Sequence, residues 1–174
     1  DWEIPYVEKE KNTFVSVMTC DQTERKGADL IINVAKLLTN CTFYIAGTRF
    51  IKGVEELPKN VKCLGRLTPS ELRDLYSKTQ FYLQLSNFEG FGVAICEAML
   101  CYCVPIVSDV NFLPNIVGDT GFILRKREEI MLEKVIKNAL NDNLQLLGKK
   151  AKNRIETQFP VSKRRDRLAN VLKH

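Results

Sequence analysis

Two glutamates and two glycines lie within a nine-residue stretch near the middle of this 174-residue chain, at Glu89, Gly90, Gly92 and Glu97. The glycines let a bound group approach the main chain closely. The helix predicted from Gly92 onward offers unpaired N–H groups and the positive end of its dipole, which suit a phosphate or a sugar hydroxyl. A tight turn has the same pattern, so the glycines alone indicate an anion site only weakly.

Glu97 stands eight positions after Glu89, a little over two helical turns, so the two carboxylates are expected to face roughly the same side. A carboxylate on this helix is well placed to accept hydrogen bonds from a ribose diol. The rest of the helix, 93–100, is apolar. Because a buried, unpaired charge costs several kcal/mol, we expect Glu97 to have a partner. The alternative is a glutamate on the exposed face.

Two cations, Arg25 and Lys26, precede Gly27 at the end of the loop after the first predicted strand. A lysine before a helix, on the same edge of a sheet, would neutralise a diphosphate; the alternative is an ordinary surface charge. The chain has no D-x-D motif, so a diphosphate bound here need not be held through a metal ion. Its one histidine, His174, is the last residue, which excludes Ser-His-Asp, Cys-His and ordinary zinc chemistry here.

Short apolar runs alternate with helical patterns along the chain, which is typical of an α/β fold with a mostly parallel sheet covered on both faces. Ligands bind such sheets at the carboxyl ends of the strands. The loops there are 19–27, 47–53, 65–68, 86–92 and 108–115. The predicted strands are 14–18, 43–46, 61–65, 81–85, 104–107 and 121–124. The predicted helices are 28–38, 92–100, 127–140, 144–157 and 161–173. A further helix is predicted to begin at a capping box, Thr68-Pro69-Ser70-Glu71.

Composition is close to that of an average globular protein, with 45% hydrophobic and 27% charged residues. We expect residues 1–12 to be a lead-in or linker and 13–174 to form a single domain that ends in a basic helix. No apolar run approaches the ~20 residues that a membrane span needs. No signal peptide is visible. Because the chain begins at Asp1, we interpret it as a piece of a longer protein or a processed one.

The six cysteines include no C-x-x-C pair, and we interpret them as small buried hydrophobic residues in a reducing compartment, the cytoplasm. The net charge is +5, and the basic excess lies in residues 145–174. This tail suits an anionic membrane surface, so membrane association is one interpretation and a solvated helix face is the other. Because no aromatic residues are interleaved with the basic ones, we expect no nucleic-acid partner.

The stretch Glu89-Gly90-Phe91-Gly92 to Glu97-Ala98 occurs in order with several other segments, and together they resemble the C-terminal half of a GT-B glycosyltransferase, close to glycosyltransferase family 4. The stretch itself is similar to that family's E-x7-E motif with its internal G-F-G. The resemblance covers about residues 13–173. The other matching segments are Lys26-Gly27, 61–65, 72–76, 104–107 and 113–122.

The resemblance implies a Rossmann-like, three-layer domain that binds a nucleotide diphosphate sugar as substrate and belongs to a retaining enzyme with no need of a metal ion or another cofactor. Glu89 would lie near the transferred sugar as the catalytic residue, and Glu97 would bind the ribose. Lys26 would contact the diphosphate, with Arg25 as the candidate second cation. The other donor-binding residues would be Gly90, Phe91, Gly92 and Val93 at the phosphate and sugar oxygens, and Arg66 and Leu67 around the base.

The implied reaction moves a hexose-type sugar to an acceptor such as a glycan or a lipid-linked saccharide, as in polysaccharide biosynthesis. The family's acceptor site lies on an N-terminal domain that this chain lacks, so we expect the chain to bind donor without transferring sugar alone. Cys20 or Asp21 stands in the place of a family arginine, and Asn111, Phe112 and Asn115 depart from the pattern that bears on the donor sugar. A non-catalytic nucleotide-sugar-binding module and a flavodoxin-like module therefore remain as alternatives.

Overall fold

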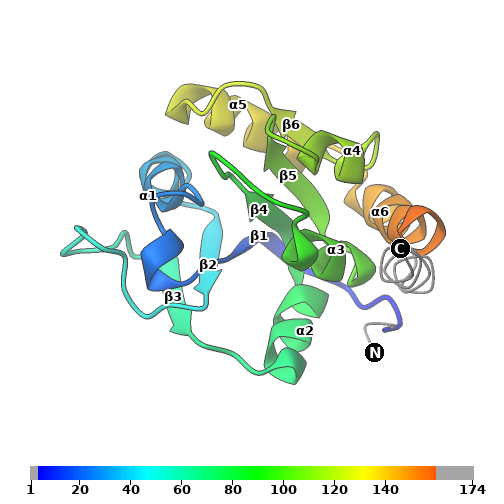
Figure 1. Ribbon diagram of the computed structural model, residues 1–174, viewed down its shortest axis with the longest axis horizontal. Coiled ribbons are helices and arrows are strands. Elements are labelled where there is room, and N and C mark those ends of the chain that lie inside the picture. Colours follow the sequence, from blue (N-terminus) through cyan, green and yellow to red (C-terminus); the bar gives the residue numbers. More distant parts are fainter. Residues whose placement is uncertain (1–3, 160–174) are drawn as a thin grey trace, which may run out of the picture.

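The computed structural model describes residues 4–159, which are built around a six-stranded sheet (Figure 1). Every pair of neighbouring strands runs parallel, which confirms the predicted parallel sheet. The strand order is β3-β2-β1-β4-β5-β6. The strands are β1 (Glu10–Val17), β2 (Thr42–Ala46), β3 (Val61–Gly65), β4 (Thr79–Gln84), β5 (Val104–Ser108) and β6 (Phe122–Leu124).

Helices cover both faces of the sheet (Figure 1). On one face α1 packs beside α5, and on the other α3 packs against both α2 and α6. Continuous apolar strands must be buried on both sides, and the three-layer arrangement follows from that requirement. The helices are α1 (Ala28–Leu37), α2 (Pro69–Lys78), α3 (Val93–Leu100), α4 (Leu113–Val117), α5 (Glu129–Leu140) and α6 (Leu144–Gln158), with a 3-10 helix, η1, at Cys20–Gln22.

Aromatic side chains hold the central strands together. The Phe14 ring of β1 stacks between Phe43 of β2 and Phe81 of β4, with ring centroids 4.9 and 4.7 Å away. On the other face, Tyr82 of β4 packs edge-on against Tyr76 of α2 at 5.9 Å. Because alternate residues of a strand point to opposite faces, β4 contributes to both cores, and its carboxyl end is fixed beside that of β1.

The start of α2 confirms the predicted capping box. The Thr68 hydroxyl accepts a hydrogen bond from the Glu71 N–H at 3.3 Å, and the Glu71 carboxylate accepts one from the Thr68 N–H at 2.7 Å. Pro69 occupies the first turn, where a missing N–H costs nothing. Local side-chain chemistry therefore sets the point at which the chain turns back after β3.

Three segments differ from the sequence prediction or lie outside the structure. β1 begins at Glu10, before the apolar run, because pairing with β4 extends the strand into the polar residues of the predicted lead-in 1–12. α4 forms in a stretch that the sequence predicts as a loop, with Pro114 in its first turn. The predicted basic helix 161–173 lies outside the described residues.

The six cysteines are free thiols, as the sequence predicts. Cys41, Cys101 and Cys103 are buried, and Cys20, Cys63 and Cys96 are half-buried. Cys63 and Cys96 each pack against the edge of one core. Within residues 4–159 no helix has both the length and the apolar composition to cross a membrane.

Candidate functional site

The loop after β4 brings Glu89 to the two cations that follow β1. Glu89 Oε2 lies 3.9 Å from Lys26 Nζ and 3.9 Å from Arg25 Nη1. β1 and β4 are parallel neighbours, so the loops at their carboxyl ends meet at the same edge of the sheet. Three of the residues that the sequence singles out therefore form one charged cluster.

Lys26 is half-buried in this cluster, and its ammonium donates one hydrogen bond to the Val17 carbonyl at 3.1 Å. Burial lowers the pKa of Lys26, the Glu89 carboxylate acts in the opposite direction, and Arg25 lowers the pKa further. An ammonium has three N–H donors. Since one of them is used on the backbone and Glu89 lies beyond hydrogen-bond distance, Lys26 retains the capacity to bind an anion.

Arg25 ties the loop after β1 to the loop after β4. Its guanidinium donates to the Phe88 carbonyl at 2.6 Å, and its own carbonyl accepts from the Asn87 N–H at 2.8 Å. The Arg25 side chain is 38% exposed, so its guanidinium also faces solvent. Arg25 thus combines a structural contact with an accessible positive charge next to Lys26.

Glu89 is held by residues at the ends of two strands. Its Oε2 accepts a hydrogen bond from Gln84 Nε2 at 2.8 Å, and its Oε1 accepts one from the Gly90 N–H at 3.2 Å. Its own N–H donates to Asn111 Oδ1 at 3.2 Å. Asn111 follows β5 in a left-handed conformation, with φ of 49°, which asparagine tolerates better than most residues. The sequence marks Asn111 as a departure from the family, and here it positions the main chain of Glu89.

Two helices begin at this edge of the sheet with a glycine and without a side-chain cap. Gly27 precedes α1 with φ of 79°, and Gly92 precedes α3 with φ of 74°. A Cβ on Gly92 would lie 3.7 Å from Glu89 Cγ, so the start of α3 adjoins the charged cluster. The first N–H groups of both helices, which carry the positive ends of the helix dipoles, therefore lie near Lys26.

Replacing Gly27 with alanine is expected to lower the free energy of unfolding by about 2–3 kcal/mol. A Cβ at Gly27 would lie 2.5 Å from the Leu85 carbonyl oxygen, and its φ of 79° strains any other residue. Urea unfolding measures the loss. Gly53 is the matched control, since it has φ of 78° and no atom within 4 Å of a Cβ. Equal losses in Gly27→Ala and Gly53→Ala would show that the close approach of Gly27 to Leu85 contributes nothing.

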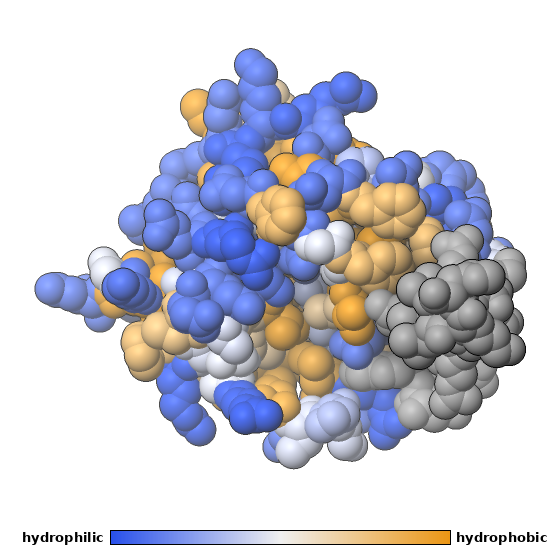
Figure 2. All heavy atoms as spheres, viewed as in Figure 1, coloured by the Kyte–Doolittle hydropathy of each residue, from blue (hydrophilic) through white to orange (hydrophobic). Residues whose placement is uncertain are grey.

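An aromatic cluster lies beside the start of α3. It is made up of Phe91 before α3, Phe112 before α4 and Phe159 after α6. The Phe91 ring lies 6.2 Å from that of Phe112 and 6.0 Å from that of Phe159, measured between centroids. Figure 2 shows apolar side chains gathered over α3 and α4 on this face. Val93 of α3 is 48% exposed. The Phe91 ring thus packs on other aromatic rings and the Val93 side chain is exposed, whereas the backbone at Gly92 adjoins Glu89.

Glu97 lies on α3 and is half-buried, and burial raises the pKa of its carboxyl group. Among residues 4–159 the structure provides no hydrogen-bond or ion-pair partner for this carboxylate, so the expectation of a partner is wrong for the described chain. A partly desolvated carboxylate without a partner retains its full capacity to accept hydrogen bonds from a ligand.

Arg66 and Leu67 follow β3, which is separated from β1 by β2. Arg66 is exposed, and Leu67 lines a groove of about 350 Å³ beside α2. No hydrogen bond or ion pair within the described chain joins either residue to Lys26 or Glu89. These two residues lie at the same edge of the sheet as the charged cluster but are not part of it.

Sequence reasoning missed two residues that hold the loop after β4. Arg127 donates to the Leu85 carbonyl at 2.9 Å and to Asn87 Oδ1, and its guanidinium lies 3.7 Å from the Asp29 carboxylate of α1. Arg127 follows β6, and the loop after β6 belongs to the same edge as those after β1 and β4. The second missed residue, Gln84, is a polar residue inside the apolar run 81–85, and that contrast is the signal that could have found it.

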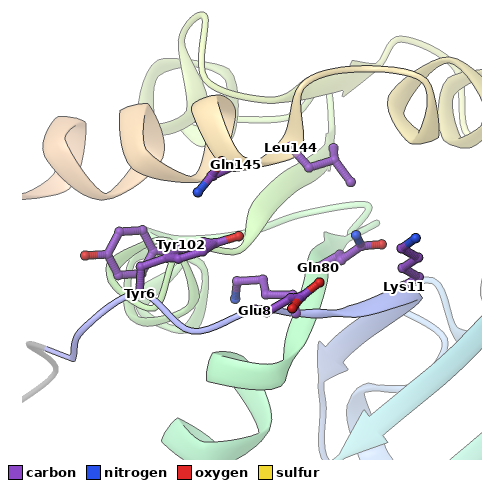
Figure 3. A pocket seen from close by; sticks show the side chains of 8 residues that line it. Tyr6, Glu8, Lys11, Gln80, Tyr102, Leu144 and Gln145 are labelled. Atoms are coloured by element: carbon purple, nitrogen blue, oxygen red, sulfur yellow. The ribbon is translucent and has the colours of Figure 1, made fainter.

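A separate hollow of about 190 Å³ lies at the opposite, amino edge of the sheet (Figure 3). Lys11 and Gln80 line it from β1 and β4, and the Tyr6 and Tyr102 rings meet edge-on there at 5.4 Å. It contains none of the residues that the sequence singles out. The charged cluster and this hollow are therefore two distinct regions of the molecule.

Solved structures share this fold. TarM superposes with a TM-score of 0.82 at 18% identity, covering 99% of this chain and 37% of that one. Anabaena Alr3699/HepE in complex with UDP-glucose superposes with a TM-score of 0.80 at 19% identity, covering 94% of this chain and 49% of that one. The described residues therefore have the Rossmann-like α/β architecture of one half of a GT-B glycosyltransferase.

Relatives of known name match part of the chain. O-antigen chain mannosyltransferase B of Escherichia coli is 31% identical over 83 residues, which are 48% of this chain and 22% of that protein. Alpha-galactosylglucosyldiacylglycerol synthase of Streptococcus pneumoniae (strain ATCC BAA-255 / R6) is 30% identical over 154 residues, 82% of this chain and 41% of that protein. The chain thus spans less than half the length of either relative. The family model described as "Glycosyl transferases group 1" matches residues 3–158, and the chain belongs to this family of glycosyltransferases.

Proposed function

We propose that this chain is the donor-binding domain of a retaining, metal-independent glycosyltransferase close to glycosyltransferase family 4. The observation that carries the proposal is the cluster of Lys26, Arg25 and Glu89 beside the uncapped starts of α1 and α3. Two positive side chains and two positive helix ends at one sheet edge suit a diphosphate, and a carboxylate beside them suits the hydroxyls of a sugar.

The proposed roles follow this arrangement. Lys26 and Arg25 bind the diphosphate, and the backbone N–H groups from Gly90 to Val93 bind phosphate and sugar oxygens. Glu89 contacts the transferred sugar, and Glu97, with its unpaired carboxylate, accepts the ribose hydroxyls. Arg66 and Leu67 frame the base at the neighbouring end of β3.

Catalysis in this proposal depends on charge already in place before the reaction. The bond between the sugar and the diphosphate breaks as the acceptor hydroxyl bonds to the same sugar carbon and gives its proton to the leaving diphosphate, on which negative charge develops. Lys26, Arg25 and the two helix starts stabilise that charge without reorganising, and Glu89 holds the sugar in position. These cations perform the task that a metal ion would otherwise perform.

The relatives support a hexose donor. Their names include a mannosyltransferase and a galactosylglucosyldiacylglycerol synthase, and one structural neighbour binds UDP-glucose. We therefore infer a nucleotide diphosphate hexose as the donor and a glycan or a lipid-linked saccharide as the acceptor, in polysaccharide biosynthesis. An acceptor-binding domain outside this chain completes the enzyme, so the chain alone binds donor without transferring sugar.

The proposal places the enzyme in the cytoplasm, where free thiols persist. The basic residues 160–174 lie outside the described residues, and their composition supports contact with an anionic membrane surface in the full-length protein. Flotation of the full-length protein with vesicles that contain anionic lipid, compared with neutral vesicles, tests this part of the proposal.

Calorimetric titration of the 174-residue chain with UDP, GDP and ADP and their hexose conjugates tests donor binding. We expect saturable binding to one base, unchanged by EDTA. Glu97→Gln should weaken nucleotide binding about tenfold, because the ribose hydroxyls lose a charged hydrogen-bond acceptor. Burial raises the pKa of Glu97, so its carboxylate is protonated at a higher pH than that of an ordinary glutamate. On acidification, nucleotide affinity should therefore begin to fall at that higher pH. Binding that requires a divalent metal ion would contradict the proposed chemistry.

A non-catalytic nucleotide-sugar-binding module is the second candidate. It is favoured by Cys20 and Asp21, which stand where the resemblance leads us to expect an arginine. Sugar transfer by the full-length protein, abolished by Glu89→Ala, would establish the enzyme. Binding of a sugar nucleotide to the full-length protein without transfer to any acceptor would establish the module.

A further inference from the structure

We propose that Gln84 is a positioning residue that fixes the orientation of the Glu89 carboxylate, and thereby the affinity for the sugar part of the donor. Gln84 Nε2 donates to Glu89 Oε2 at 2.8 Å. The same amide nitrogen donates to Ser86 Oγ at 2.8 Å, and that hydroxyl lies 3.5 Å from Glu89 Oε2. This inference rests on the proposed function, in which Glu89 contacts the transferred sugar.

The Gln84 amide is fully engaged and has one orientation. The Tyr82 hydroxyl donates to Gln84 Oε1 at 2.9 Å, so the carbonyl end of the amide is occupied and both N–H donors point toward Ser86 and Glu89. Burial, with the Glu89 and Glu97 carboxylates nearby, raises the pKa of Tyr82 well above its ordinary value, so its hydroxyl stays protonated and remains a donor.

Burial makes this row of hydrogen bonds rigid. Tyr82 and Ser86 are 0% exposed, and Gln84 is 2% exposed. A buried amide that loses its partners cannot exchange them for water, so a rotation of Gln84 would leave several polar groups unpaired. The position of Glu89 is thereby set by β4, a strand at the middle of the sheet, although Glu89 itself stands in a loop.

Glu89 has further hydrogen-bond partners besides Gln84, and the remaining acceptor capacity of its carboxylate faces Arg25 and Lys26. Oε1 accepts from the Gly90 N–H, and the Glu89 N–H is held by Asn111. Arg25 and Lys26 lie 3.9 Å from Oε2, beyond hydrogen-bond distance. Without Gln84, the carboxylate would lose the hydrogen bond that fixes its Oε2 atom and would be free to rotate. It would then be misplaced for the sugar.

Gln84→Met is the test, because methionine has a similar length and volume and has no N–H donor. The probes are UDP, GDP, UDP-glucose and GDP-mannose, titrated into the 174-residue chain by calorimetry. We expect Gln84→Met to weaken the sugar conjugate about five- to tenfold and to leave the matching nucleoside diphosphate within about twofold of wild type. In a Glu89→Ala background the substitution should have no further effect on the sugar conjugate.

Two further variants separate positioning from general damage to the fold. Tyr82→Phe removes only the hydroxyl that orients the amide, and should give a smaller loss in the same direction. Gln80→Met is the matched control: Gln80 lies at the other end of β4, where its side-chain oxygen accepts from the Asn12 N–H at 2.7 Å. It should leave affinity for both probes unchanged, and thermal unfolding reports whether each variant is folded.

The outcomes are distinct. A selective loss of sugar affinity that disappears in Glu89→Ala supports the inference. Wild-type affinity in Gln84→Met and Tyr82→Phe, an equal loss for nucleotide and conjugate, or a loss that persists in Glu89→Ala overturns it while the proposed function stands. If wild type binds no nucleotide, the proposed function fails and this inference fails with it.

Discussion

Replacing Lys26 with methionine is expected to weaken binding of the nucleoside diphosphate about a hundredfold, because a partly desolvated ammonium forms strong hydrogen bonds with phosphate oxygens. Methionine keeps the aliphatic stem and removes the charge. Calorimetric titration of the 174-residue chain measures the change. Lys36→Met is the control, since Lys36 is an exposed lysine in the last turn of α1, away from Gly27. An equal effect in both variants would indicate a loss of general surface charge.

The same lysine gives the binding a pH dependence. Burial lowers the pKa of Lys26 below its ordinary value of 10.5, so its charge is lost at a lower pH than for a free lysine. Affinity for the nucleotide should therefore fall as the pH rises through that lowered value, and Lys26→Met should not show this fall. At a pH between the lowered pKa of the folded protein and the ordinary pKa of the unfolded chain, Lys26 is protonated only in the unfolded chain. In that pH range the contribution of Lys26 makes the free energy of unfolding increase as the pH rises. Wild-type affinity that stays constant up to pH 10.5 would contradict the assignment.

Replacing Lys9 with methionine is expected to lower the free energy of unfolding by about 3 kcal/mol, because three carbonyl groups would lose a charged donor. Lys9 Nζ donates to the carbonyls of Tyr76, Thr79 and Cys101 at 2.8, 2.9 and 2.8 Å. The ammonium thus joins the ends of α2 and α3 to the start of β4, at the edge opposite the charged cluster. It also lies at a helix C-terminus, where a positive charge is favoured.

Urea unfolding measures this loss, with Lys11→Met as the control because Lys11 is an exposed lysine in β1, two residues after Lys9. Nucleotide affinity of the folded fraction of Lys9→Met should equal that of wild type, since Lys9 is remote from Lys26 and Glu89. A stability loss no larger than that of the control would show that water replaces the ammonium at the three carbonyls.

Much of the fold could be predicted because its determinants are local. The capping box at Thr68 and Glu71 fixes the start of α2 within four residues of sequence. The placement of Lys26 beside Glu89 also follows from the sequence, because loops at the carboxyl ends of parallel strands share an edge whatever the details of their side chains. A local motif was sufficient for the start of α2, and the topology of the sheet was sufficient for the placement of Lys26.

The support of the site could not be predicted in this way. Gln84 stands in an apolar run, and its partner Glu89 is in a loop whose path the pattern does not fix. Arg127 acts across the sheet on Leu85 and Asn87, which are remote in sequence. The missing partner of Glu97 likewise depends on the side chains that surround α3 in three dimensions. Such contacts depend on packing and not on periodicity.

The position of β1 has a consequence for the synthesis of this protein. β1 lies between β2 and β4, and Thr13 of β1 bonds Gln80 of β4 from 67 residues away. As the ribosome releases the chain, one edge of β1 stays open until α1, β2, β3 and α2 have all emerged. Open apolar edges are where nascent chains associate wrongly, so chains stalled before β4 should depend on chaperones. Competence to bind an anion should follow later still, once the Asn111 loop has left the exit tunnel.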